Sequence, residues 1–128
     1  MNCPKNLKYA HSHEYVETLE NGHVRIGLSD YAQSELGDLV FVNLPQEGDT
    51  VSAGDPFADV ESVKAVADVL SPVSGTVCAI NEDLLDNPQH INEDPYNAWF
   101  AEVEVDGYSD DLMDSDAYEA FCEEEKNA

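Results

Sequence analysis

The residue best placed to carry chemistry in this chain is Lys64, in the middle of the segment ESVKAVAD at residues 61–68. It is the only lysine between Lys8 and Lys126. An exposed lysine can be acylated, which removes its charge and turns its stem into a tether for the acyl group. The alternative is an ordinary solubilising surface lysine, so the interpretation depends on the sequence around it.

Short valine-rich stretches flank this lysine on both sides. The first stretch, residues 54–60, has Gly54 and Pro56 near its start. The second, residues 69–75, has Pro72 and Gly75 near its end, so turn residues bound the pair on the outer side. This pattern predicts a β-hairpin with Lys64 at its tip. A hairpin tip holds its side chain clear of the sheet, where another protein can reach it.

The charge balance of the 128-residue chain restricts its partners. Asp and Glu number 28 against five Lys and Arg, which gives a formal net charge of −23. Nucleic acids and anionic membrane surfaces both attract Lys and Arg, so neither is expected as a partner. An acidic surface favours attraction to basic patches on other proteins, and a high-salt habitat would also explain it.

The cysteines indicate a reducing compartment. Cys3, Cys78 and Cys122 are an odd number at wide spacing, which fits neither a disulfide framework nor a zinc site. The sequence shows no signal peptide and no apolar run of membrane-spanning length. We therefore expect one cytoplasmic domain over residues 1–128 with free thiols. Cys78 and Cys122 are interpreted as small core residues, and no Cys–His arrangement is readable.

The first half of the chain predicts short strands joined by turns. Strands are expected over 9–19 and 24–28 around an Asn-Gly turn at 20–23. A helix over 31–35 should begin at Ser29 or Asp30 and stop at Gly37. A buried strand over 39–44 and a brief strand over 50–52 complete this half.

The second half predicts a long loop before Trp99 and a last strand over 99–105, broken by Gly107. A helical turn is expected over 110–113. A helix capped by Ser115 or Asp116 should then dock through Tyr118 and Phe121, which lie three apart. Its end should fray at 123–125, because three glutamates oppose the helix dipole. Residues 37–42 and 75–80 share one pattern, which indicates two similar halves in a flattened β-sandwich.

Other candidate sites are weaker. His11 and His13 would lie on one face of a strand as a possible metal pair, but no further ligand stands at a sensible spacing, so no metal site is predicted. The carboxylates are too numerous to nominate a catalytic pair, and most are interpreted as a solvated surface.

Residues 61–65, ESVKA, resemble the lipoyl-attachment site of the glycine cleavage system H protein family. Other segments are similar to that family in the same order, so that the likeness runs from about residue 7 to residue 125. These segments are 7–16, 27–42, 71–75, 92–96 and Trp99.

The resemblance implies lipoic acid bound covalently to Lys64. It also implies a mainly β fold, a lipoyl/biotinyl-type barrel-sandwich hybrid with pseudo-twofold halves, with a short helix after the second strand and a C-terminal helical extension at 110–125. Biotin carriers set the lysine between methionines, which Val63 and Ala65 do not match. The residues implied in recognition of the attachment site are Glu61, Ser62, Val63 and Ala65.

By the same resemblance the chain is a carrier and not an enzyme. Glycine decarboxylase, with pyridoxal phosphate, would load the lipoyl disulfide with an aminomethyl group. Aminomethyltransferase would pass the one-carbon unit to tetrahydrofolate, and dihydrolipoyl dehydrogenase would reoxidise the dithiol with FAD. A lipoate ligase or octanoyltransferase would supply the lipoyl group. In the family the loaded arm folds into a cleft of the carrier, and the matching polar residues here are Ser12, Glu14 and Asp68.

Two departures concern the contact surface for partner enzymes. Only Asn97 and Ala98 separate the Pro-Tyr pair from Trp99, and the strand after it carries glutamates where the family commonly has lysines. An alternative role is a lipoyl or octanoyl relay that serves other acceptor domains. A third is a structural binding module with Lys64 unmodified.

Overall fold

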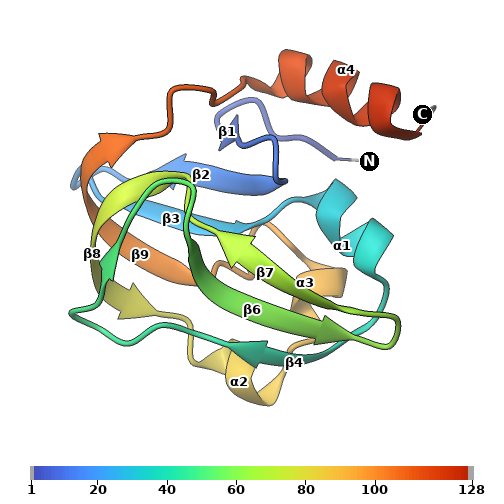
Figure 1. Ribbon diagram of the computed structural model, residues 1–128, viewed down its shortest axis with the longest axis horizontal. Helices are drawn as coiled ribbons and strands as arrows, with labels where there is room; N and C mark the ends of the chain where they lie inside the picture. The colour runs from blue at the N-terminus through green and yellow to red at the C-terminus, as the bar shows by residue number, and fades with distance from the viewer. Residues whose placement is uncertain (1, 127–128) are drawn as a thin grey trace.

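The computed structural model describes residues 2–126 and consists of two antiparallel β-sheets bordered by helices (Figure 1). The larger sheet has the strand order β1-β2-β3-β9-β8-β5, and the smaller has the order β4-β6-β7. The strands are β1 (Lys8–Tyr9), β2 (Glu14–Thr18), β3 (Val24–Leu28), β4 (Leu39–Asn43), β5 (Thr50–Val51), β6 (Pro56–Ser62), β7 (Val66–Leu70), β8 (Val73–Ile80) and β9 (Ala101–Tyr108). The helices are α1 (Asp30–Leu36), α2 (Asp83–Asp86), α3 (His90–Glu93) and α4 (Ser115–Lys126).

The predicted β-rich sandwich with a C-terminal helix is confirmed, although the sheets do not close into a barrel. Three clusters of buried apolar residues form the core, one of them beneath α4. Another lies between the small sheet and the helices and includes Leu39, Val60 and Phe100. The third follows β3, β8 and β9 and includes Ile26, Val77 and Val103. Valines alternate inward along these strands, which is the period that buries one face of a sheet.

The hairpin around Lys64 is confirmed. β6 and β7 pair antiparallel, with Glu61 opposite Val66 at the last pair before the turn. In Figure 1 this turn lies at one edge of the molecule and β8 lies at the opposite edge. Lys64 itself is exposed, as the hairpin pattern predicted.

The first strand prediction was wrong in one respect. Residues 9–19 do not form one strand, because a turn separates β1 from β2. His13 has φ 78°, a left-handed conformation that a regular strand does not contain. His11 and His13 therefore do not share a strand face. The Asn-Gly turn at 20–23 is confirmed, with Gly22 at φ 84°.

Helix α1 forms where the capping residues predict it. The Ser29 hydroxyl accepts a hydrogen bond from the Ala32 N–H at 3.2 Å, which satisfies one of the free donors of the first turn. Gly37 ends the helix at φ 80°. Strand β4 follows, but it is not the buried strand predicted, because Val40 and Phe41 are about half exposed.

The second half of the chain differs from the prediction at several points. The expected long loop holds α2 and α3, and β9 continues through Gly107 to Tyr108. Residues 110–113 form no helical turn. Asp114, one residue before the predicted caps, accepts from the Ala117 N–H at the start of α4. Helix α4 extends to Lys126, past the three glutamates at 123–125 where fraying was predicted.

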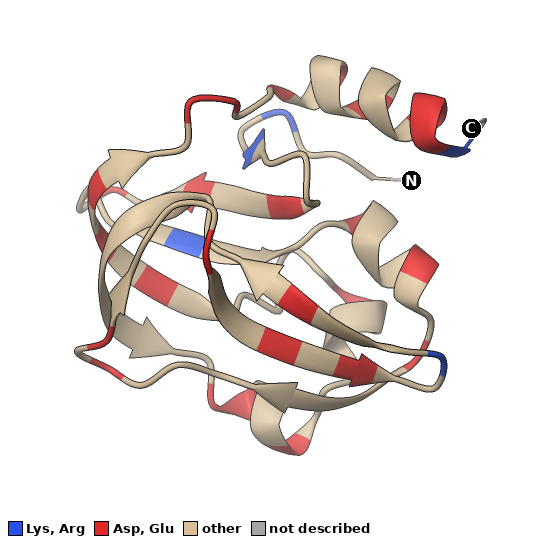
Figure 2. Ribbon diagram, viewed as in Figure 1, with Lys and Arg blue, Asp and Glu red and all other residues tan. Residues whose placement is uncertain are grey.

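Docking of α4 on the rest of the molecule is confirmed. Tyr118 is fully buried, and its ring stacks on Tyr9 with centroids 4.4 Å apart. Phe121 is partly buried beside it. None of the helices over residues 2–126 is both long and apolar enough to span a membrane. Figure 2 shows acidic residues spread along the strands, loops and helices rather than gathered in one place.

Candidate functional site

Ser62 builds the turn that presents Lys64. Its hydroxyl oxygen lies 3.1 Å from the backbone N–H groups of both Lys64 and Ala65, and its own N–H donates to the Ala65 carbonyl at 2.8 Å. The Val63 N–H donates to the Asp38 carbonyl at 3.0 Å, which ties the turn to the segment after α1. A residue predicted for enzyme recognition therefore also fixes the local backbone.

The lysine side chain lies against the end of α1. Its Nζ is 3.5 Å from the carbonyl oxygen of Glu35. A Cβ at Gly37 would stand 3.3 Å from Lys64 Cε, which is a tight contact, and the positive φ of Gly37 disfavours any side chain there. Gly37 thus both ends the helix and leaves room for the lysine stem.

A cleft of about 340 Å³ begins next to this lysine. Glu35, whose carbonyl faces Lys64 Nζ, is one of its lining residues. Most of the wall is apolar and comes from β3, α1 and the small sheet. The apolar lining residues are Leu28, Tyr31, Ala32, Leu36, Val60, Ala67 and Val69.

Ser12, Glu14 and Asp68 all line this cleft, so the structure brings the three predicted residues together. Glu14 is 1% exposed, whereas Ser12 and Asp68 are exposed. Ala67 and Val69, on either side of Asp68, line the interior of the cleft, and side chains alternate along a strand. Asp68 therefore lies at the rim, and Glu14 is the carboxyl group inside.

Two hydrogen bonds hold the Glu14 carboxyl group. One oxygen accepts from the Ser12 hydroxyl, and the other accepts from the Leu70 N–H at 3.1 Å. β7 is an edge strand, so Glu14 satisfies a backbone donor that has no strand partner there. Burial raises the pKa of Glu14 to about 7, and the two hydrogen bonds oppose that rise. The group thus titrates near neutral pH.

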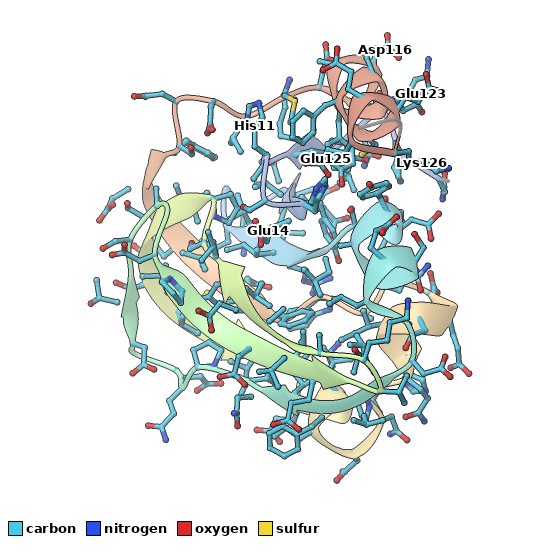
Figure 3. All side chains as sticks on the ribbon, turned by 45° about the vertical axis from the view of Figure 1, so that its right-hand side comes forward. His11, Glu14, Asp116, Glu123, Glu125 and Lys126 are labelled. Atoms are coloured by element: carbon cyan, nitrogen blue, oxygen red, sulfur yellow. The ribbon has the colours of Figure 1, made fainter. Side chains whose placement is uncertain are left out.

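Helix α4 forms another part of the cleft wall through Glu125. His13 joins this helix to the cleft, because its Nδ1 lies 2.8 Å from the Tyr118 hydroxyl and its Nε2 lies 2.8 Å from Glu125 Oε2. The Tyr118 hydroxyl also meets the Ser29 hydroxyl at 2.5 Å. In Figure 3 Glu14 lies in the interior below α4, and Glu125 stands on the side of the helix facing the rest of the chain.

Sequence reasoning missed His13, Tyr31 and Glu125 as cleft residues. Tyr31 lay on a correctly predicted helix, but the face it presents depends on packing. Glu125 is more than a hundred residues from His13, so no local pattern could have paired them. His11 and His13 have different partners: His11 meets Asp111 at 3.0 Å, whereas His13 meets Tyr118 and Glu125.

Of the two cysteines predicted to lie in the core, one does and the other does not. Cys122 is fully buried, as expected of a core residue, and Cys3 is buried beside it. Cys78 is exposed, so its assignment to the core was wrong. Its sulfur lies 3.5 Å from His23 Nδ1, a Cys–His arrangement that the sequence did not reveal.

Comparison with known proteins gives one consistent family. The family model described as glycine cleavage H-protein matches residues 7–125. A glycine cleavage system H protein of Lachnoclostridium phytofermentans is 50% identical over 125 residues, covering 98% of both chains. A probable glycine cleavage system H protein of Pyrococcus furiosus is 48% identical, covering 91% of this chain and 90% of that one.

A solved structure agrees with these relatives. The crystal structure of a glycine cleavage system H protein from Mycobacterium marinum superimposes with a TM-score of 0.86 at 37% identity. It covers 91% of this chain and 96% of that chain. Likeness in sequence and in fold therefore extends over nearly the whole molecule.

Proposed function

The chain belongs to the glycine cleavage H-protein family, and from that premise we propose that Lys64 carries its lipoyl group and that the cleft beside it receives the loaded arm. The protein is a lipoyl carrier of the glycine cleavage system and not a catalyst. The observation that supports the proposed sites best is the adjacency of Lys64 to a largely apolar cleft with one buried carboxyl group.

Lys64 is suited to attachment by its exposure and its backbone. A modifying enzyme brings the activated acyl group, so the lysine itself requires no nearby base, only access and a fixed turn. Glu61, Ser62, Val63 and Ala65 form that turn, and Ser62 holds it with four hydrogen bonds. When bound, the lipoyl group supplies a disulfide that accepts the aminomethyl group of glycine.

The residues of the cleft fit such an arm. Apolar side chains from α1, β3 and the small sheet suit its hydrocarbon stem, because burying that stem removes apolar surface from water. Glu14 suits the amine of the cargo, which is cationic at neutral pH. A carboxylate buried in the cleft binds a cation more strongly than a surface carboxylate, since little water competes with it.

Because the pKa of Glu14 is raised, binding of the cargo amine is coupled to the release of a proton. Without cargo, Glu14 holds a proton in a sizeable fraction of molecules near pH 7. An entering ammonium group favours the ionised carboxylate, so Glu14 releases that proton to solvent as the ion pair forms. Entry of the cargo therefore increases the fraction of molecules in which Glu14 is ionised.

The partners are the other enzymes of the glycine cleavage system. We assign delivery of the aminomethyl group to glycine decarboxylase, its removal to aminomethyltransferase and reoxidation to dihydrolipoyl dehydrogenase. A lipoate ligase or octanoyltransferase acts on Lys64 beforehand, in the cytoplasm. We also assign residues 1–128 to one lipoyl-carrier domain, in which the helical extension at 110–125 contributes Glu125 to the cleft wall.

The intact mass of the protein purified from its native cells tests this proposal. We expect one added lipoyl group, located by peptide fragmentation at Lys64. A mass equal to the unmodified chain, or a lipoyl group located on another lysine, would contradict it.

A further inference from the structure

Three side chains on the outer face of the larger sheet converge away from the cleft. They are His23, just before β3, Cys78 on β8 and Glu102 on β9. β9 lies between β3 and β8 in the sheet, so neighbouring strands bring together residues that are far apart in sequence. Among residues 2–126 this is the one group of three or more His, Cys and acidic ligand atoms close enough to share a metal ion.

The register of the sheet explains the convergence. Glu102 pairs with Arg25 on one side and with Ala79 on the other. The pairing of β8 with β9 shifts between Val77 and Ala79, so Cys78 is the extra residue of a bulge. Bulges redirect a side chain, and here the thiol lies on the exposed face, 3.6 Å from Glu102 Oε2.

The spacing of the three ligand atoms matches a tetrahedral ion. Cys78 Sγ lies 3.5 Å from His23 Nδ1 and 3.6 Å from Glu102 Oε2, and Nδ1 lies 3.2 Å from Oε2. Zinc bond lengths of about 2.3 Å to sulfur, 2.05 Å to nitrogen and 2.1 Å to oxygen give tetrahedral edges of about 3.6, 3.6 and 3.4 Å. The observed triangle therefore differs from that face by about 0.2 Å or less.

The surroundings orient these ligands. Arg25 Nε lies 3.5 Å from Oε1 of Glu102, while His23 and Cys78 lie next to the other oxygen, Oε2. The Arg25 guanidinium carbon lies 4.5 Å from the centroid of the Trp99 ring. The side chains of His23 and Glu102 are 29% and 16% exposed, so both are partly shielded yet reachable. Such outer contacts fix the direction of metal ligands in known sites.

We propose that His23, Cys78 and Glu102 form a binding site for a zinc-class divalent ion, separate from the lipoyl cleft. A thiolate and an imidazole select zinc and similar transition metals over Mg²⁺ and Ca²⁺, which prefer oxygen ligands. The chain provides three ligands to the ion, and a water molecule provides the fourth. Binding exchanges the thiol proton of Cys78, which leaves to solvent, for a metal–sulfur bond. The ion links the turn before β3 to β8 and β9 and so stabilises that part of the sheet.

Cobalt(II) titration tests the site, because Co²⁺ replaces zinc and reports a thiolate ligand by its absorption. The full-length chain carries Lys64→Arg in every sample, so that no lipoyl dithiol competes for the metal. We expect one equivalent of Co²⁺ to give thiolate-to-cobalt charge transfer in the near ultraviolet and intense tetrahedral bands in the visible. Addition of Zn²⁺ should abolish both.

Variants distinguish this site from casual binding to an acidic surface. Cys78→Ser should lose the charge-transfer band, and Glu102→Gln should weaken Co²⁺ binding by more than about 10-fold, since even outer-shell changes cost 10- to 100-fold. His90→Gln removes a histidine that contacts Asp83 at 2.5 Å elsewhere and should change nothing. Weak carboxylate-type bands without charge transfer, or a band that persists in Cys78→Ser, would overturn the proposal.

Discussion

The turn that presents Lys64 and the cleft beside it place their key groups in opposite environments. Lys64 is exposed at the β6–β7 turn, while Glu14 is 1% exposed and has a pKa raised to about 7 by burial. The two regions touch through α1, since Glu35 contacts the lysine and lines the cleft. In the proposed function, other enzymes act at the exposed turn, and the shielded cleft holds the cargo between their reactions.

This difference explains why the Lys64 turn could be predicted from the sequence and the shape of the cleft could not. The turn is local, because Ser62, Lys64 and Ala65 are within four residues and their hydrogen bonds close within the hairpin. The cleft is assembled from β2, β3, α1, β6, β7 and α4, and it depends on packing between residues more than a hundred positions apart. Changes in the two regions should therefore have distinct effects.

The largest effect is expected from Lys64→Arg. The guanidinium keeps the charge but cannot form the acyl-lysine amide, so lipoylation should be lost entirely while the fold is retained. Intact mass after incubation with a lipoate ligase measures this. Lys8→Arg, another exposed lysine, should be modified like the wild type; a lipoylated Lys64→Arg protein would refute the assignment of the attachment site.

The next effect concerns the buried carboxyl group. A pKa raised from 4.5 to about 7 means that the folded state binds more protons than the unfolded state between these pH values. The contribution of Glu14 to stability is thus greatest below pH 4.5 and is lost as pH rises to about 7, by about 3 kcal/mol at 1.36 kcal/mol per unit.

Urea unfolding from pH 4.5 to 8 should show this loss as a difference between wild type and Glu14→Gln, which has no group to titrate there. Glu17→Gln, on the same strand and partly exposed, is the control and should follow the wild type. Parallel stability curves for wild type and Glu14→Gln would show that burial does not perturb Glu14.

A smaller effect is expected where α4 closes the cleft. Tyr118→Phe removes the hydroxyl that meets both His13 Nδ1 and Ser29 Oγ, so each of these groups loses one hydrogen bond inside the contact between α4 and the rest of the chain. We expect a loss of about 1–3 kcal/mol in the free energy of unfolding. Tyr108→Phe, at a side chain that is 51% exposed, should cost little. Equal stability of the two variants would mean that this contact does not hold α4.

The smallest effect should come from the overall charge. The net charge of −23 attracts basic partner surfaces, and salt screens that attraction over about 10 Å at 0.1 M. The KM of glycine decarboxylase for this carrier should therefore rise a few-fold from low to high salt, with kcat little changed. A KM that stays constant over that range would exclude electrostatic steering.

Much of the fold followed from local patterns, and the failures have physical reasons. The Asn-Gly turn, the Ser29 cap and the valine-rich hairpin are short-range signals, and all three were confirmed. The break between β1 and β2 was missed because His13 adopts a left-handed conformation without being glycine. Helices α2 and α3 are single turns of four residues, too short for a helical period to appear.

The candidate sites also combine features that local sequence predicts with features that depend on packing. Attachment at Lys64 was predicted from the segment at 61–65, and Ser12, Glu14 and Asp68 were named by resemblance; the structure places those three residues around one cleft. The burial of Glu14 raises its pKa and accompanies the contact of its carboxyl group with β7 at Leu70, 56 residues away, so it could not be predicted from the local sequence. The convergence of His23, Cys78 and Glu102 depends on strand order and on a one-residue bulge, neither of which the sequence displays.

The most direct test of the account is the lifetime of the loaded arm in the absence of aminomethyltransferase. Carrier loaded with labelled glycine carbon is held at fixed pH and temperature, and retained label is measured for wild type, Glu14→Gln and the control Glu17→Gln. A charge-assisted hydrogen bond contributes about 1.5–3 kcal/mol, so Glu14→Gln should lose label about tenfold faster or more. Identical decay of all three proteins would contradict the claim that the buried carboxylate in the cleft protects the cargo.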